Sequence, residues 1–588
     1  KDNKWLITLS PMHAGGPYDM QIDGSNQVTV KNILIGDIWV CSGQSNMELS
    51  MERLKDKYPA IISSANNSNI RQFNVSTNYN FHAAQQDLPS GNWETATAES
   101  VLHFTAVGYF FAKALYEKYH IPIGLIKSAV GGSPAEAWLS AEALKQFPTY
   151  QLKAVTLKND AYVDSLKKSD KADSDTWYNN IWQNDAGLHG EKKWFDTSYN
   201  AAAWGKVEEP SDWKDAGIET NGVVWFRKTF HVPSNMLNKP VRLFLGTIVD
   251  RDSVYINGIF AGATQYRYPP RKYVLPAGFL KEGENVLVVR VINYAGMGGF
   301  TKDKPYKLFA ENDTIHLEGK WQYKPGATSA PIPISTTFNY MPGGLFNAMM
   351  APLTNYSIKG VIWYQGESNT SRAEEYHQLF SALIKDWRQH WKQGNFPFLY
   401  VQLANFMKIN EQPSQSDWAA LREAQFKTLA VPNTGMAVTT DIGTSNDIHP
   451  RNKVDVGKRL AAIALHDVYN KQGEYMGPMY QSMQSEGNKI IITFTHTGSG
   501  LVAKDKYGYL RGFEIAGADK EFHYAKAMIQ GDKVVVFADA VSNPVAVRFG
   551  WTDDAGEDNL FNKEGFPASP FRTDTWKGIT EENKFTIQ

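Results

Sequence analysis

The sequence of 588 residues contains a single cysteine, Cys41. A lone cysteine cannot form a disulfide within the chain, so the cysteine content is compatible with both reducing and oxidising compartments. Cys41 ends a run of apolar residues, which indicates a small buried side chain rather than a reactive thiol.

The chain also lacks an excess of charge of either sign. Its 60 Lys and Arg residues and 61 Asp and Glu residues give a formal net charge of −1. This balance argues against nucleic acid or an anionic membrane surface as the main partner. No apolar run reaches the roughly 18 residues that a membrane-spanning helix needs. The length exceeds what one hydrophobic core supports, so several domains are expected.

Two blocks of alternating strand and helix signals lie on either side of a β-rich stretch. In the first block, residues 33–41 and 123–130 are predicted strands and residues 105–119 a predicted helix. The second block has predicted strands at 360–364, 396–403 and 435–440, with helices around 376–387, 421–429 and 454–466. Five strands alternating with helices predict an α/β domain with a parallel sheet covered on both faces. In such sheets the chemistry lies at the carboxyl ends of the strands.

The stretch between the blocks has a different character. Short predicted strands, separated by Gly, Asn, Asp and Pro, lie at 223–232, 241–245, 253–256 and 285–292. Asn257-Gly258 is a strong hairpin signal. The pattern predicts a β-sandwich inserted into a loop of the α/β domain.

The two ends of the chain are also β-like. Residues 489–494 and 533–538 are predicted strands within a C-terminal β domain. We expect the first 32 residues to pair elsewhere, with this C-terminal region as the candidate partner. The predicted division is 1–32 (N-terminal β segment), 33–189 (catalytic domain, first part), 190–330 (inserted jelly-roll β-sandwich), 331–472 (catalytic domain, second part) and 473–588 (C-terminal β domain).

A serine follows the first predicted strand, within residues 42–47 (Ser-Gly-Gln-Ser-Asn-Met). A serine hydroxyl at a tight turn from strand to helix is exposed at the sheet edge, beside the N–H groups of the helix start. Ser45 is therefore the candidate nucleophile. The alternative is that Ser45 only caps the helix beginning near Met47.

A histidine follows the last predicted strand, in residues 447–450 (Asp-Ile-His-Pro). A serine becomes a good nucleophile when an imidazole takes its proton, and a carboxylate orients that imidazole. His449 is the candidate base and Asp447 the candidate acid, while Asp441 at the strand end is a competing acid. A loop histidine can also be an ordinary surface or core residue.

Two further segments offer donors for an oxyanion hole. Residues 131–138 begin with two glycines at a strand end, where a ligand can approach backbone N–H groups closely. A plain turn is the alternative. Residues 363–369 offer the side-chain amides of Gln365 and Asn369. The four segments together predict a nucleophile, a base with its acid, and oxyanion donors on one sheet edge.

These four motifs, in this order, resemble those of the sialate O-acetylesterase family over about residues 30–185 and 335–470. The resemblance implies a flavodoxin-like SGNH-hydrolase domain that hydrolyses acetyl esters on carbohydrates through an acyl-serine, without metal or cofactor. It assigns Ser45 as nucleophile, His449 as base and Asp447 as the orienting acid. The spacing of two residues between acid and histidine, where many members of the superfamily have three, leaves Asp441 open.

The resemblance also implies an oxyanion hole formed by the amides of Ser45 and Gly132 with one side-chain amide. The superfamily normally uses an Asn in this motif. Here Gln365 at the strand end is favoured over Asn369, since it lies nearer the sheet edge. Glu367 and Arg451 are the predicted substrate contacts.

The predicted insert resembles the jelly-roll sugar-binding domain of family-two glycoside hydrolases at residues 224–230, 252–258 and 283–291. Such domains often serve as scaffolding, so glycan binding and a structural role are both open. By analogy with bacterial glycan-degrading enzymes, we expect a periplasmic or secreted protein.

The expected partner is an O-acetylated carbohydrate, and two substrate classes are open. Sialic acid carries a carboxylate and calls for an arginine near the pocket, for which Arg451 is the candidate. Acetylated xylan or xyloglucan is uncharged and would need aromatic platforms, and 13% of the residues are aromatic. A non-catalytic glycan-binding protein is the rival from another class, and the intact Ser45, Asp447 and His449 count against it. The oligomeric state is open.

Overall fold

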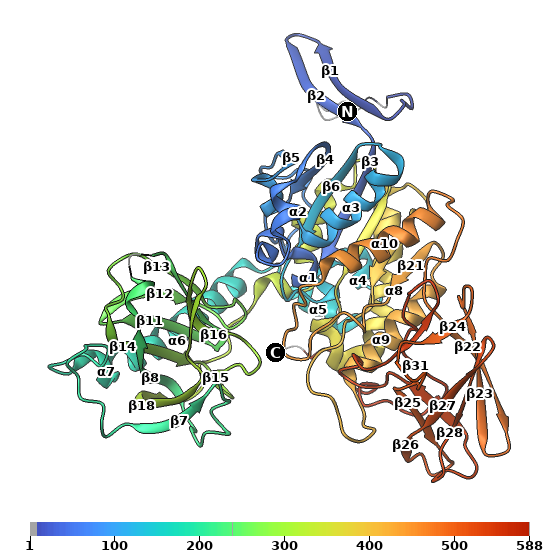
Figure 1. The fold of residues 1–588 in the computed structure, drawn as a ribbon. Coiled ribbons are helices and arrows are strands. Elements are labelled where there is room, and N and C mark those ends of the chain that lie inside the picture. Colours follow the sequence, from blue (N-terminus) through green and yellow to red (C-terminus); the bar gives the residue numbers. More distant parts are fainter. Residues whose placement is uncertain (1–6, 8, 238, 587–588) are drawn as a thin grey trace. The chain divides into compact units, whose positions relative to one another are not determined.

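The computed structural model describes residues 7, 9–237 and 239–586 (Figure 1). The parts of the predicted β segments that fall on residues 1–6, 8, 238 and 587–588 lie outside the described residues. Asp160–Thr336 forms one compact unit, and the chain before and after it forms the other.

The unit that contains the four motifs is built on a seven-stranded sheet, in the order β21-β20-β19-β3-β6-β4-β5. The strands are β3 (Asp37–Gly43), β4 (Asn66–Asn74), β5 (Trp93–Thr97), β6 (Ile123–Ala129), β19 (Gly360–Tyr364), β20 (Phe398–Val401) and β21 (Thr434–Ala437). All neighbours pair in parallel except the edge strand β5, which is antiparallel to β4. Every residue of β19 and β20 is buried, as expected for a parallel sheet covered on both faces.

Helices cover both faces of this sheet. They include α3 (Ala106–Tyr119), α8 (Ala373–Trp391), α9 (Asp417–Lys427) and α10 (Lys453–Asp467). The Trp39 ring on β3 meets Phe111 of α3, whereas the Trp363 ring on β19 meets Trp387 of α8. Trp363 pairs with Ser42, three residues from Trp39, so the two indoles point to opposite faces. Helices α3 and α8 therefore cover opposite faces, and α10 packs against α3.

The N-terminal strands differ from the sequence prediction. The predicted strand 33–41 is divided between β2 (Gln27–Ile35) and β3 at Gly36, where the backbone lies so close to Pro122 that an added Cβ would be 2.0 Å from its carbonyl oxygen. β1 (Gly15–Asp23) pairs with β2 in a two-stranded antiparallel sheet. The expectation that the first residues pair with the C-terminal region is therefore wrong for the described residues.

The unit Asp160–Thr336 is a β-sandwich with one long helix, α6 (Asp160–Gln183). Its sheets have the orders β12-β11-β14-β8-β18-β7 and β13-β9-β16-β17. The strands are β7 (Gly205–Glu209), β8 (Asn221–Val232), β9 (Val241–Leu245), β11 (Arg251–Ile256), β12 (Ile259–Thr264), β13 (Lys272–Leu275), β14 (Gly283–Asn293), β16 (Tyr306–Ala310), β17 (Asp313–His316) and β18 (Gly319–Ser329).

Alternate residues of β8 face different layers of this unit. Phe226 lies in the core between the two sheets, while Trp225 lies on the outer face with Trp177 and Ile181 of α6. Helix α6 thus shares a core with the sandwich, although the predicted boundary at residue 190 placed it in the catalytic domain.

The C-terminal region is a second β structure within the first unit. One sheet contains β22 (Met479–Glu486), β23 (Lys489–Thr495), β27 (Lys526–Gln530) and β28 (Lys533–Phe537), and another contains β25 (Phe513–Ala516), β26 (Phe522–Tyr524), β29 (Ala546–Phe549) and β31 (Phe571–Arg572). Residues of both sheets, such as Ile490 and Val547, share one hydrophobic core.

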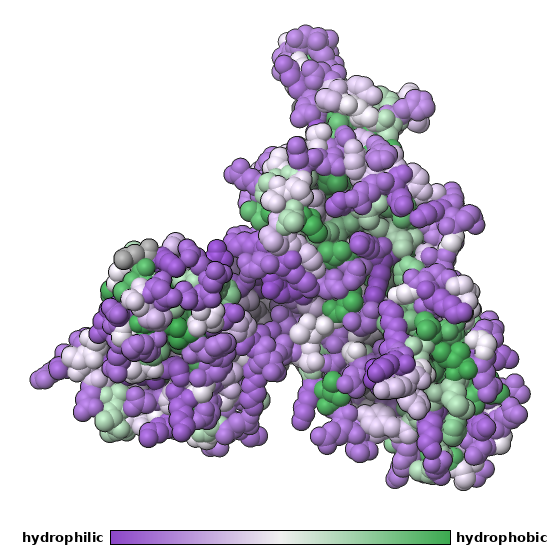
Figure 2. All heavy atoms as spheres, viewed as in Figure 1, coloured by the Kyte–Doolittle hydropathy of each residue, from purple (hydrophilic) through white to green (hydrophobic). Residues whose placement is uncertain are grey.

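Hydrophilic residues predominate on the face of the molecule seen in Figure 2, with hydrophobic residues in scattered groups. Within the residues that the structure describes, no helix combines the length and apolar character needed to cross a membrane.

Candidate active site

Three of the four motifs lie at the carboxyl ends of β3, β6 and β19, and the fourth, residues 447–450, lies in the loop between β21 and α10. Ser45 begins the short helix α1 (Ser45–Glu48) directly after β3. Gly43, with φ +129°, lets β3 and β19 converge, since a Cβ added there would lie 2.1 Å from the Tyr364 carbonyl oxygen. The Gln44 amide donates to the same oxygen over 2.9 Å. The turn that carries Ser45 is therefore fixed to the end of the neighbouring strand.

The glycine turn after β6 lies beside Ser45. A Cβ added at Gly131 would lie 3.6 Å from Ser45 Cβ, and the Gly131 amide donates to Glu48 Oε2 over 2.8 Å. Within the described part of the chain, the amides of Ser45 and Gly132 donate to no protein acceptor. Two unused N–H donors near one hydroxyl are what an oxyanion hole requires.

Two side chains fix the conformation of the glycine turn. The Tyr340 hydroxyl donates to the Gly131 carbonyl over 3.0 Å, and the Ser368 hydroxyl donates to the Gly132 carbonyl over 2.8 Å. Gly132 has φ +73°, a left-handed conformation that favours glycine. Both carbonyls are thus held while the Gly132 amide is left unused.

The side-chain amides of the third motif are fully buried. Gln365 Nε2 donates to Asn369 Oδ1 over 2.6 Å, and Asn369 Nδ2 donates to Glu136 Oε2 over 2.9 Å. Asn369 Oδ1 also accepts from the Ala135 amide over 3.0 Å, which joins the third motif to the second. The oxyanion role of Gln365 or Asn369 stays a prediction. For Gln365, this role would require Nε2 to exchange the Asn369 Oδ1 atom, or the Ser133 carbonyl to which it also donates over 3.4 Å, for the substrate.

Asn46, next to Ser45, connects the nucleophile turn to the histidine loop. Its Nδ2 donates to Glu367 Oε1 over 2.6 Å and to the Ile448 carbonyl over 3.0 Å. Its Oδ1 accepts from Lys453 Nζ over 2.5 Å, and Lys453 has no solvent exposure. Neither Asn46 nor Lys453 was identified from the sequence. The only sequence signals are their positions, one residue after Ser45 and four residues after His449.

The two candidate acids have different partners. Asp447 Oδ1 accepts from the His449 backbone amide over 3.0 Å. Asp441 is bound through both carboxylate oxygens by Arg459, over 2.6 and 2.7 Å. Asp441 therefore forms a bidentate ion pair with Arg459, whereas the Asp447 carboxylate contacts the loop that carries His449.

Burial and neighbouring charges set the protonation of this loop. Burial lowers the pKa of His449 to about 4, with a further lowering by the Lys453 charge and an opposing effect of Asp447. Burial also lowers the pKa of Lys453 to about 7, although Glu367 opposes this shift. At neutral pH the imidazole is unprotonated and able to accept a proton.

The two predicted substrate contacts occupy different environments. Glu367 is part-buried, burial raises its pKa, and its Oε1 is held by Asn46. The Arg451 side chain is 40% exposed, and its Nη2 lies 4.0 Å from the Asp56 carboxylate. Among the described residues, Arg451 Nε has no hydrogen-bond acceptor. Both side chains thus carry buried polar atoms that have no hydrogen-bond partner among the described residues, Nε and Nη2 of Arg451 and Oε2 of Glu367.

This arrangement has the parts of a nucleophilic acyl-transfer site. A hydroxyl begins a helix, a neutral imidazole lies on a loop joined to that helix, and two amides are unused. Over the described residues, no three His, Cys, Asp or Glu side chains are grouped to hold a metal ion.

Two family models match the chain. The model described as "Carbohydrate esterase, sialic acid-specific acetylesterase" matches residues 35–182 and 334–466. The model described as "Glycosyl hydrolases family 2, sugar binding domain" matches residues 158–324.

Individual relatives agree with the first of these models. A sialate O-acetylesterase from Rattus norvegicus is 24% identical over 84% of this chain and 69% of its own length. One from Mus musculus is 23% identical over 94% of this chain and 80% of its own length. The crystal structure of a carbohydrate acetylesterase from Xanthomonas citri matches 96% of this chain and 87% of that chain, with 30% identity and a TM-score of 0.61.

Proposed function

Because the chain belongs to the carbohydrate esterases described as sialic acid-specific acetylesterases, and is thus a carbohydrate O-acetylesterase, we propose that it releases acetate from O-acetylated sialic acid. Ser45 is the proposed nucleophile, His449 the base and Asp447 the acid that orients it. The observation that carries the proposal is the hydrogen bond from Asn46 to the Ile448 carbonyl, which joins the neighbours of Ser45 and His449.

In the proposed mechanism, His449 takes the proton of the Ser45 hydroxyl as Oγ attacks the acetyl carbonyl. The Ser45 and Gly132 amides stabilise the tetrahedral oxyanion, and Asp447 stabilises the imidazolium. The sugar oxygen leaves with the proton from His449. Water, activated in turn by His449, then hydrolyses the acyl-serine and releases acetate.

The finer assignments are part of the same proposal. The sheet order and the motifs at its carboxyl edge support a flavodoxin-like SGNH-hydrolase domain, interrupted by a jelly-roll insert within Asp160–Thr336. By analogy with other glycan-degrading enzymes, we also propose a bacterial protein that is periplasmic or secreted.

Arg451 supports sialic acid as the substrate. Its side chain is 40% exposed and lies two residues after His449, and its buried Nε and Nη2 atoms have no hydrogen-bond acceptor among the described residues. A guanidinium is suited to bind a carboxylate, which sialic acid has and neutral xylan or xyloglucan lacks.

The test measures acetate release from O-acetylated sialic acid, acetylated xylo-oligosaccharide and an aryl acetate. Ser45→Ala should lose several orders of magnitude on every substrate, while Ser63→Ala, at an exposed helical site, should match wild type. Arg451→Gln should impair only the sialic acid substrate, with Arg511→Gln as an exposed control.

Each alternative predicts a different result. Acetate release from the xylo-oligosaccharide alone would mean that the substrate is a plant polysaccharide, while the proposed mechanism would still hold. No release from any of the three compounds would favour a non-catalytic glycan-binding protein. Activity that survives Ser45→Ala would disprove the proposed nucleophile.

A further inference from the structure

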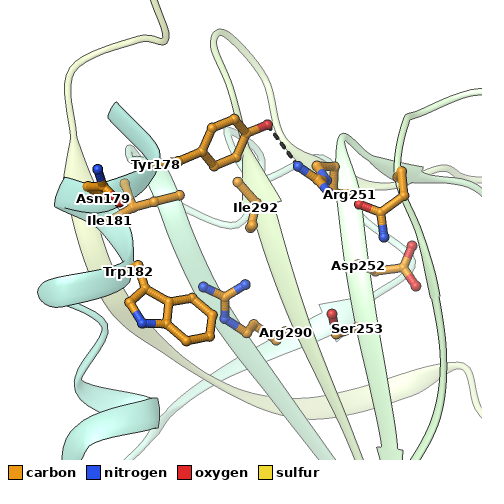
Figure 3. A pocket seen from close by; sticks show the side chains of 10 residues that line it. Tyr178, Asn179, Ile181, Trp182, Arg251, Asp252, Ser253, Arg290 and Ile292 are labelled. Carbon is orange, nitrogen blue, oxygen red and sulfur yellow. Dashed lines mark hydrogen bonds between the residues drawn. The ribbon is translucent and has the colours of Figure 1, made fainter. Parts of the chain in front are cut away.

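A pocket of about 320 Å³ lies within the unit Asp160–Thr336, between helix α6 and the outer face of the larger sheet (Figure 3). Its walls include Trp182 from α6, Arg251 and Ser253 from β11, and Arg290 from β14. None of these side chains takes part in the proposed hydrolysis. The pocket therefore needs an explanation of its own.

One wall of the pocket is an exposed tryptophan. Trp182 is 58% exposed, although Trp177 on the same helix is only 5% exposed. Aromatic side chains are common in the linings of ligand pockets. An indole presents a flat face that is suited to the C–H face of a sugar ring.

A buried arginine presents its terminal nitrogens to the same pocket. Arg290 is 7% exposed, and its Nε donates to Asp185 Oδ2 over 2.7 Å. Figure 3 shows the terminal nitrogens of Arg290 directed into the space between Trp182 and Ser253. Within the described residues these two nitrogens have no hydrogen-bond acceptor. Their fork geometry is suited to a carboxylate.

The charges around the pocket leave a net positive charge. Arg290 is balanced by Asp185, and Asp252 is bound by Arg271 over 2.5 Å. The Arg251 guanidinium donates to the Tyr178 hydroxyl over 2.8 Å, and no carboxylate among the described residues forms an ion pair with it. An anionic ligand would balance this charge, whereas a neutral ligand would not.

We propose that this pocket binds an acidic sugar residue, with the ring against Trp182 and the carboxylate at Arg290 and Arg251. The Ser253 hydroxyl and the Gln265 amide, which also line the pocket, are available to the sugar hydroxyls. The site would attach the enzyme to an acidic glycan separately from the Ser45 site. The inference does not depend on the identity of the ester that is hydrolysed.

The test is calorimetric titration of the full chain with sodium N-acetylneuraminate, sodium glucuronate, xylose and sodium acetate. We expect at least one acidic sugar to bind at millimolar concentration, and xylose and acetate to bind about tenfold more weakly or not at all. Trp182→Ala and Arg251→Gln should each weaken the acidic sugar about tenfold. Phe260→Ala, at a 55% exposed aromatic outside this pocket, should bind like wild type.

Several outcomes would overturn the inference. One is that wild type binds neither acidic sugar, and another is that Trp182→Ala binds them as tightly as wild type does. A third is that acetate or xylose binds as tightly as the acidic sugars. Aryl acetate hydrolysis and Tm, measured on the same samples, should be unchanged in Trp182→Ala, because its side chain is exposed. Failure of this site would then leave the proposed hydrolysis intact.

Discussion

Lys453 is the residue through which the nucleophile turn and the base influence each other. Its ammonium group is fully buried and donates to Asn46, while its charge lowers the pKa of His449. A buried lysine is costly unless nearby groups stabilise it. Glu367, which shares Asn46 with Lys453, opposes the lowering of the Lys453 pKa. The network thus combines positioning of the turn with control of the base.

The first prediction concerns the pH dependence of the wild-type enzyme. The neutral imidazole is the base, and its pKa is lowered from 6.5 to about 4. We expect kcat/KM to stay constant as the pH falls below 6.5 and to decline only as it passes through about 4. Hydrolysis of an aryl acetate across this range checks the expectation. An acid limb near 6.5 would mean that His449 titrates like an exposed histidine.

The second prediction is that Lys453→Met moves this acid limb to higher pH. The substitution removes a cation that lowers the pKa of His449, so imidazole protonation begins at higher pH. The substitution also removes the hydrogen bond from Lys453 to Asn46 Oδ1, which helps position the turn that carries Ser45, so kcat should fall. Lys458→Met, at an exposed position of the same helix, is the matched control and should keep the wild-type profile. A lower kcat with an unmoved limb would indicate a positioning role alone.

At the scale of elements, the glycine turn after β6 depends on the absence of a side chain. A Cβ added at Gly132 would lie 1.9 Å from the Tyr340 hydroxyl oxygen, at a residue with φ +73°. We expect Gly132→Ala to displace the backbone N–H and reduce kcat roughly 100- to 1000-fold, as for loss of an oxyanion donor. Steady-state kinetics on an aryl acetate measures this.

The control for this substitution separates steric conflict from backbone strain. Gly394 has a similar φ of +66°, but an added Cβ there meets nothing within 4 Å. Gly394→Ala should lower Tm slightly and leave kcat unchanged. Combining Gly132→Ala with Tyr340→Ala should recover part of the lost rate if the tyrosine causes the conflict. Equal rates for Gly132→Ala and wild type would exclude the Gly132 amide from the oxyanion hole.

The elements that could be predicted from sequence are those with strong apolar patterns. β19 and β9 begin and end as predicted, because Gly360–Tyr364 and Val241–Leu245 are mainly apolar runs between turn residues. β4 was missed because it begins with four polar residues, from Asn66 to Asn69. The break at Gly36 was not predicted, and the close approach to Pro122 there involves a segment distant in the sequence.

The same distinction applies to the candidate site. Ser45 stands in a short motif at the end of β3 and His449 in one on the loop after β21, so their residue types and positions predict their roles. The bond between Lys453 and Asn46 joins residues 407 positions apart. Such a partnership depends on how the sheet brings its strand ends together, and no local pattern indicates it.

At the scale of the whole molecule, one buried arginine joins the C-terminal β region to the sheet that carries the site. Arg422 on α9 is fully buried. It donates to the carbonyls of Leu403 and Ala404, after β20, over 2.9 and 2.8 Å. It also donates to the carbonyls of Thr552 and Asp553, in the C-terminal region, over 2.7 and 2.8 Å. The C-terminal region is thus packed as part of the catalytic unit.

The last prediction follows from these four bonds. Arg422→Met removes these four hydrogen bonds and leaves the Leu403 and Thr552 carbonyls without a donor among the described residues, whereas Ala404 keeps Trp418 Nε1 and Asp553 keeps the Phe406 amide. We expect a loss of about 3 kcal/mol in the free energy of unfolding. Arg388→Met is the matched comparison, because Arg388 also donates to carbonyls, those of Phe396, Pro432 and Asn433, without touching the C-terminal region. Urea denaturation should show both variants destabilised. Limited proteolysis should release the C-terminal region more readily from Arg422→Met than from Arg388→Met, since only the first variant loses hydrogen bonds to that region. Equal protection of the region in both variants would mean that other contacts hold it in place.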